Sequence, residues 1–114
     1  MTMTLPQRSE SFTVDRAGFL VRTVMPRSPG RPYEHRCSLA TYEAVAHEID
    51  EIGEAGFIGE EIVARTGLPF SQVMTALAFL RERGCIATEC KRNYASGPGV
   101  HADAMIEYHA LREA

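Results

Sequence analysis

The sequence lacks the features of several large protein classes. Every apolar run in the 114 residues is short, and none approaches the roughly 18 to 20 residues that a helix needs to cross a bilayer. Residues 1–10 do not show the charged and then apolar order of a secretory signal. We therefore expect a soluble, cytoplasmic protein with no membrane partner.

Recognisable catalytic motifs are also missing. The sequence holds no glycine-rich phosphate loop, no paired-histidine motif and no serine elbow. The scattered serine, histidine and aspartate residues have no local arrangement that would assemble a triad. We therefore expect no catalytic residues and no enzymatic activity.

Cysteine is scarce and odd in number. Cys37, Cys85 and Cys90 cannot all pair within one chain, so reduced thiols are the simplest interpretation. Cys85 and Cys90 are too far apart for a usual zinc motif, and Cys37 with His35 lies far from both in the sequence. We expect neither a metal site nor a cofactor.

The residues that are present favour one domain with a single core. A hydrophobic content of 45% in a chain of this length allows one core and not two. The net charge is −3, but charge is segregated: residues 1–37 hold six arginines and three acids, residues 38–62 seven acids and no Lys or Arg, and residues 63–96 five basic residues and two acids. The net charge therefore does not exclude a basic surface.

The N-terminal third has a weak strand signal followed by a proline-rich segment. Residues 11–25 alternate apolar and polar side chains on either side of Ala17-Gly18, which predicts two short strands or a ragged hairpin. Pro26, Pro29 and Pro32 follow within seven residues and exclude a regular element there. We interpret this segment as a linker or an arm.

Periodicity predicts a helix after Ser38. Ser38 can act as the N-cap of this helix, and the apolar residues that follow recur every three or four positions: Leu39, Tyr42, Val45, Ala46, Ile49 and Ile52. The acidic residues of this segment fall on the other faces. Gly53 and Gly56 end the helix.

Two shorter helices are predicted next, over residues 59–66 and 70–83. Gly67 can adopt the left-handed conformation that ends the first helix, and Pro69 can begin the second. Gly84 stops the second helix. A strand over residues 85–90, a polar turn at Lys91-Arg92-Asn93 and a return strand from Tyr94 follow, and residues 100–112 have the spacing of an amphipathic helix.

This order of elements carries a resemblance to a known family. The segments IVARTGLPFSQVMTAL (residues 62–77) and LRERGCI (residues 80–86) resemble bacterial winged helix-turn-helix transcription regulators. The resemblance covers about half of the chain. It implies an α+β fold that is mainly α with a small β hairpin: a winged helix-turn-helix over residues 38–96, an N-terminal extended arm over residues 1–37 and a C-terminal helix over residues 97–114.

The resemblance also implies a function, the binding of double-stranded DNA by a transcription regulator. The helix over residues 70–83 would read the major groove, and residues 91–94 would form the wing. If Val73, Leu77 and Leu80 face the core, the opposite face presents Ser71, Gln72, Thr75 and Ala78. We expect base contacts from Ser71, Gln72 and Thr75.

Contacts with the DNA backbone are expected from the basic residues around this helix. They are Arg65, Lys91 and Arg92, together with Asn93. The arginines of the arm, Arg27, Arg31 and Arg36, could enter a minor groove. Both sets follow from the resemblance together with the charge pattern.

An alternative function stays open, because the predicted reading helix has no Arg or Lys before Arg81. A winged-helix module can bind another protein, here with an apolar surface formed by Phe70, Met74 and Phe79.

The C-terminal helix presents Ala104, Met105, Tyr108 and Leu111 on one stripe, which predicts either a homodimer contact or packing on its own domain, and we favour the homodimer. We expect His101 and His109 to be surface residues.

Overall fold

The computed structural model describes residues 9–26 and 30–114, which form nine secondary-structure elements. In chain order these are β1 (Ser9–Val14), β2 (Leu20–Met25), β3 (Tyr33–Cys37), α1 (Leu39–Ile52), α2 (Gly59–Thr66), α3 (Phe70–Glu82), β4 (Ile86–Glu89), β5 (Arg92–Ala95) and α4 (Val100–Glu113). The fold is α+β, with one core that the helices and the first sheet share. None of the described helices is long and apolar enough to cross a membrane.

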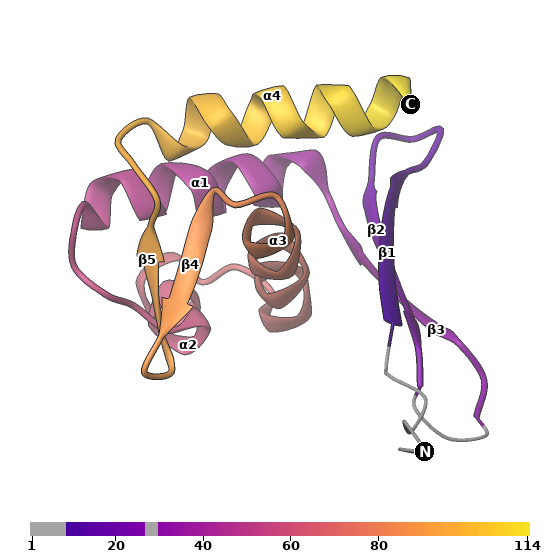
Figure 1. Ribbon diagram of the computed structural model, residues 1–114, viewed down its shortest axis with the longest axis horizontal. Coiled ribbons are helices and arrows are strands. Elements are labelled where there is room, and N and C mark those ends of the chain that lie inside the picture. The colour runs from indigo at the N-terminus through magenta and orange to yellow at the C-terminus, as the bar shows by residue number, and fades with distance from the viewer. Residues whose placement is uncertain (1–8, 27–29) are drawn as a thin grey trace, which may run out of the picture.

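The elements are arranged around α3 (Figure 1). Helices α1 and α4 run side by side, the β4–β5 hairpin and α2 lie on one side of α3, and the three-stranded sheet lies on the other. Helix α3 is therefore enclosed on two sides. Its residues from Val73 to Leu80 are all buried except Met74.

The N-terminal segment is a sheet and not an extended arm. Strands β1, β2 and β3 pair antiparallel in that order, so the predicted hairpin is confirmed and the third strand was missed. In β3 the side chains of Tyr33, His35 and Cys37 share one face, and Cys37 is fully buried. The three residues between Tyr33 and Cys37 are polar, so the sequence gives little signal of this strand.

The β1–β2 turn is fixed by local bonds and by a contact with α4. The Asp15 carboxylate accepts hydrogen bonds from the backbone N–H groups of Ala17 (3.0 Å) and Phe19 (2.9 Å). Gly18 has a φ of +90°, which favours glycine. Its carbonyl accepts a hydrogen bond from the Tyr108 hydroxyl at 2.8 Å. The first hairpin is thereby attached to the last helix.

Helix α1 begins and ends where the sequence predicts. The Ser38 hydroxyl accepts from the N–H of Thr41 at 3.1 Å, as an N-cap does. Tyr42, Val45, Ala46 and Ile49 of the predicted stripe are fully buried. The helix ends at Gly53, whose φ is 73°.

Helices α2 and α3 are joined by the predicted glycine turn. Gly67 adopts the left-handed conformation with φ 72°, and its N–H donates to the carbonyl of Val63. Pro69 precedes the first residue of α3. At the start of α2, the Glu61 carboxylate accepts from the backbone N–H of Ile58 at 3.2 Å, which satisfies one of the free donors of that helix end.

The β4–β5 hairpin turns one residue earlier than predicted. Cys90 and Lys91 form a two-residue turn in which both have positive φ, 49° and 65°. Arg92 and Asn93 already belong to β5. Phe57 forms an isolated bridge with Asn93, through hydrogen bonds of 2.9 Å and 2.7 Å, so the segment before α2 is attached to the hairpin at this one residue.

Helix α4 packs on its own chain. Ala104 and Tyr108 have no exposed surface, and Met105 and Leu111 pack against the core. The hydroxyl of Tyr42 on α1 donates to the carbonyl of Ala104 at 2.6 Å. Ala104 and Tyr108 therefore have no exposed surface for a second chain in this arrangement, because α1 and the first sheet cover this stripe.

Candidate functional site

The face of α3 that was predicted to read DNA is largely covered by the first sheet. Thr75 is only 1% exposed, and its hydroxyl donates to the carbonyl of Ser71 at 2.8 Å. Ala78 is also buried. Phe12 of β1 lies against Phe79, with ring centroids 5.2 Å apart. Thr75 therefore cannot contact a base in this arrangement, because residues expected to form an arm occupy the space in front of it.

Gln72 is half-buried and engaged within the chain. Its side-chain oxygen accepts a hydrogen bond from the backbone N–H of Ser38, at 3.0 Å, where α1 begins. A bidentate contact with adenine needs this oxygen as acceptor, so Gln72 would have to break that bond. Ser71 is exposed in the first turn of α3 and is the predicted reading residue that stays accessible.

The basic residues predicted to contact the DNA backbone differ in whether they already have a partner within the chain. Lys91 is exposed at the turn. Arg92 is exposed too, but its guanidinium donates to a carboxylate oxygen of Glu61 (2.7 Å) and to the carbonyl of Gly56 (2.8 Å). Arg65 pairs with Glu48. Such exposed pairs contribute between about 0 and 1 kcal/mol, so a phosphate can compete for both arginines.

The side chain of Asn93 is buried and hydrogen-bonded within the hairpin region. It is 6% exposed, and its side-chain oxygen accepts from the Thr88 hydroxyl (2.7 Å) and from Arg81 (3.1 Å). Asn93 was predicted to contact the DNA backbone, but in this arrangement its side chain has little exposed surface for such a contact. The turn is shifted by one residue, which places Asn93 in the paired strand.

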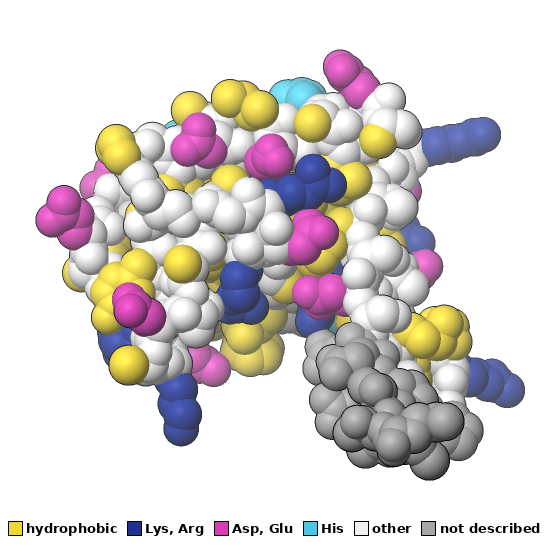
Figure 2. Space-filling model, viewed as in Figure 1, with side chains coloured by type: hydrophobic (Ala, Val, Ile, Leu, Met, Phe, Trp, Pro, Cys, Tyr) yellow, Lys and Arg dark blue, Asp and Glu magenta, His cyan; other side chains and the backbone are white. Residues whose placement is uncertain are grey.

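Of the arginines assigned to the arm, Arg36 is paired with acidic residues. Arg36 lies on β3 and pairs with Asp15 at 2.6 Å and with Glu34 at 3.6 Å. Arg31 is exposed, and Arg27 lies outside the described residues. In Figure 2, the dark blue side chains at the lower end of the β4–β5 hairpin lie beside acidic side chains, so on the face shown they do not form a continuous basic surface.

A groove of about 270 Å³ runs between the first half of α3 and the sheet. It is lined by Arg22, His35, Phe70, Ser71, Met74 and Thr75. Phe70 is 52% exposed, whereas Met74 is half-buried and Phe79 is fully buried. The apolar surface proposed for a protein partner therefore loses Phe79, which belongs to the core.

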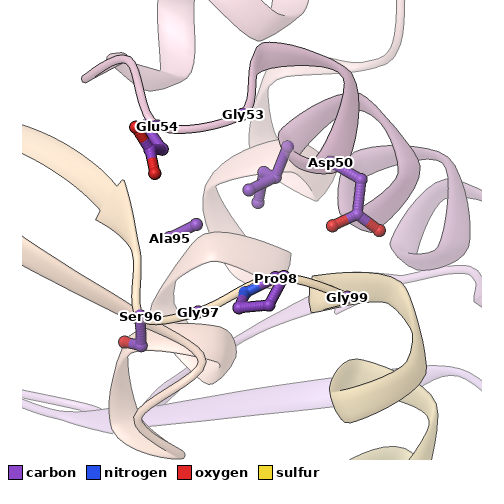
Figure 3. Close-up of a pocket in the computed structure, with 9 residues that line it drawn as sticks. Asp50, Gly53, Glu54, Ala95, Ser96, Gly97, Pro98 and Gly99 are labelled. Carbon is purple, nitrogen blue, oxygen red and sulfur yellow. The ribbon is translucent and has the colours of Figure 1, made fainter.

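A larger cleft of about 580 Å³ lies between the end of α1 and the loop that precedes α4 (Figure 3). Asp50 and Glu54 are its charged residues, and Gly97, Pro98 and Gly99 form much of its wall. The Asp50 carboxylate already accepts from the N–H groups of Val100 and His101. The cleft therefore offers few free polar groups for a ligand.

Burial raises the pKa of two of the three cysteines and so lowers the reactivity of their thiols. Cys37 is fully buried, which raises the pKa of its thiol to about 12. Burial also raises the pKa of Cys85, and the neighbouring Glu107 and Asp103 raise it further. Cys90 is exposed at the hairpin turn, so it is the accessible thiol.

One group of side chains was not foreseen. Glu43 and His47 of α1 meet His101 of α4, with donor atoms within 4.8 Å of one another. His101 was expected to be a surface residue, but its ring stacks on that of His47. The sequence signal was limited to Glu43 and His47, which are one helical turn apart, because His101 is brought to them only by the packing of α4 on α1.

Comparison of the chain with models of protein families, with curated proteins and with solved structures finds no match.

Proposed function

We propose that this chain is a winged helix-turn-helix protein that binds double-stranded DNA, with the β4–β5 turn and the first turn of α3 as its contact surface. The observation that carries the proposal is the order and pairing of elements: α1, the bridge residue Phe57, α2, α3 and the β4–β5 hairpin, with Phe57 bonded to Asn93. This order supports the proposal, because in a winged helix a hairpin follows the third helix and projects beside it.

The start of α3 supports an anion contact. No side chain caps this end of α3, and the first backbone N–H groups of a helix lack partners within the helix. Phe70 and Ser71 are exposed there. Together with the helix dipole, these N–H groups favour a phosphate oxygen.

The wing supplies charge on the same side of the molecule. In Figure 1 the hairpin turn and the start of α3 both lie at the lower side, away from α4. Lys91 is exposed at that turn, and Arg92 is exposed beside it at the start of β5. Because most of α3 is covered, the proposed contact is mainly with phosphates, and base reading is limited to Ser71 and its neighbours in the first turn.

The experiment measures binding of a mixed-sequence duplex of 20 base pairs by fluorescence anisotropy at increasing salt concentrations. Each phosphate contact contributes a slope of about −0.9 in the plot of log affinity against log salt. Lys91→Ala should lower that slope by close to one unit. Arg112→Ala removes the same charge from the exposed end of α4 and should leave both slope and affinity unchanged. Absence of binding at low salt, or an equal loss in both variants, refutes the proposal.

A second candidate function rests on the exposure of Phe70. Phe70 and Met74 provide an apolar wall of the groove beside α3, whereas Arg22, which also lines it, is already paired with Glu10 at 2.7 Å. We propose, as the alternative to DNA binding, a protein-interaction module that takes an apolar segment. Absence of duplex binding, combined with binding of an apolar fluorescent dye that Phe70→Ser abolishes, would favour this alternative.

We also propose a homodimer, but through a different face of α4 from the stripe that the sequence indicates. The stripe around Tyr108 is covered within the chain, but Ile106 on α4 is 65% exposed. We propose this outer face of α4 as the dimer contact. Sedimentation equilibrium measures it: Ile106→Asp should shift a dimer to the monomer, and a wild-type chain that is monomeric at 100 times the working concentration excludes it.

A further inference from the structure

A group of three potential metal ligands lies between α1 and α4, away from the wing. Glu43 and His47 project from α1 one turn apart, so they share a face of that helix. His101 comes from the first turn of α4. One donor atom from each residue lies within 4.8 Å of the other two.

The position of His101 is fixed by Asp50, which continues the same stripe of α1. The two carboxylate oxygens of Asp50 accept from the backbone N–H of Val100 at 2.7 Å and from that of His101 at 3.0 Å. Asp50 therefore caps α4 from another helix. The imidazole of His101 then lies on that of His47, with ring centroids 3.8 Å apart and planes at 13°.

One nitrogen in this group has no partner. The Nε2 atom of His101 is buried and makes no hydrogen bond with the described residues. The nearest carboxylate oxygen, on Glu43, is 3.7 Å away, which is too far for a hydrogen bond. A buried polar atom without a partner is costly and is rare in folded proteins. This nitrogen is therefore available to bind a ligand.

We propose that Glu43, His47 and His101 bind one divalent transition-metal ion, for which Zn²⁺ is the best chemical match. Imidazole nitrogen and carboxylate oxygen are usual zinc donors, and two histidines with one carboxylate leave a fourth position for water. Bonds of about 2.0 to 2.1 Å in a tetrahedral site place donors roughly 3.4 Å apart. The ion must lie in the plane of each imidazole that binds it, so the ring of His47 has to rotate out of its stack on His101 and the donors have to move closer together. The exposed side chain of His47 and the half-exposed side chain of Glu43 permit both movements.

The bound ion would connect two helices that are distant in sequence. It would join α1 to α4 beside the Asp50 cap, on the side of the molecule opposite the hairpin turn (Figure 1). The site uses none of the residues proposed to contact DNA. Its presence and the DNA proposal can therefore be tested separately.

The experiment is a calorimetric titration of the untagged full-length chain with Zn²⁺, together with thermal unfolding. We expect one ion per chain and a higher unfolding temperature with zinc. His47→Ala and His101→Ala should each weaken binding by about tenfold or more, because the loss of outer-shell partners alone typically costs 10- to 100-fold. With Co²⁺ in place of Zn²⁺, the wild type should show the visible absorption of a tetrahedral site.

Two matched controls address other sources of binding. His109→Ala removes an exposed histidine from α4 outside the group, and Cys90→Ser removes the accessible thiol. Both should bind zinc like the wild type. Each of three results overturns the proposal: no saturable binding up to millimolar zinc, binding that survives in the His47→Ala/His101→Ala double variant, or binding lost in Cys90→Ser. His47 is exposed, so His47→Ala decides the matter if His101→Ala fails to fold.

Discussion

Phe12→Ala tests whether the N-terminal segment is part of the core. Phe12 is 9% exposed and packs on Phe79 of α3, with ring centroids 5.2 Å apart. Removing a buried phenylalanine side chain typically costs 3 to 5 kcal/mol, and because Phe12 keeps some exposure we expect about 3 kcal/mol. An arm that does not pack would give a change within about 0.5 kcal/mol.

The measurement is an unfolding titration with urea, in which circular dichroism reports the folded fraction. The expected loss is a large part of the roughly 5 to 15 kcal/mol that stabilises a domain of ordinary size, so the midpoint should fall clearly while the slope with urea stays similar. Thr13→Ala is the matched control, because Thr13 is the next residue of β1 and is exposed. A Phe12→Ala variant that unfolds at the wild-type midpoint would refute the packing of the sheet on α3.

Three further predictions follow from the hairpin and the thiols. Lys91→Gly should raise the unfolding free energy by up to about 1 kcal/mol, because Lys91 has a φ of 65° and an L-residue is strained there. The same variant should weaken duplex binding, because it removes the charge of Lys91. A stabilised variant with undiminished binding would argue against the wing contact. Asn93→Ala should cost about 1 to 3 kcal/mol in chemical unfolding, since it removes the buried acceptor used by its neighbours. A thiol reagent at pH 8 should modify Cys90 within minutes and leave Cys37 and Cys85 unmodified until the chain unfolds, because burial raises the pKa of both; modification of all three at one rate would contradict their burial.

The helical part of the fold could be predicted because its signals are local. Ser38, Gly67 and Gly84 act within a few residues of their own positions, and each ends or begins an element in the structure. The hairpin was found for the same reason. Its turn was placed one residue late because Cys90 and Lys91 adopt positive φ, which glycine and asparagine usually signal.

The first sheet and its effect on α3 could not be predicted from such signals. The cover depends on Phe12 meeting Phe79, a contact between residues 67 positions apart. Strand β3 has a mostly polar sequence, so periodicity did not indicate it. An exposed face was therefore assigned to Thr75, which the sheet covers.

The candidate metal group was missed for a related reason. No local spacing motif marks the group, because it consists of two residues from α1 and one from α4. The link between them is the cap that Asp50 provides. Caps between different helices have no local sequence signature.

Tyr108 has a consequence for how the chain behaves as a whole. Its hydroxyl bonds the first hairpin at Gly18, and its ring lies 5.9 Å from that of Tyr42 on α1. One side chain near the end of the chain thus bridges its beginning and its middle. Helix α4 therefore helps to hold β1 and β2 in place. A shortened version that lacks α4 should lose protection of β1 and β2 against amide hydrogen exchange, although the deletion lies more than 70 residues away in the sequence.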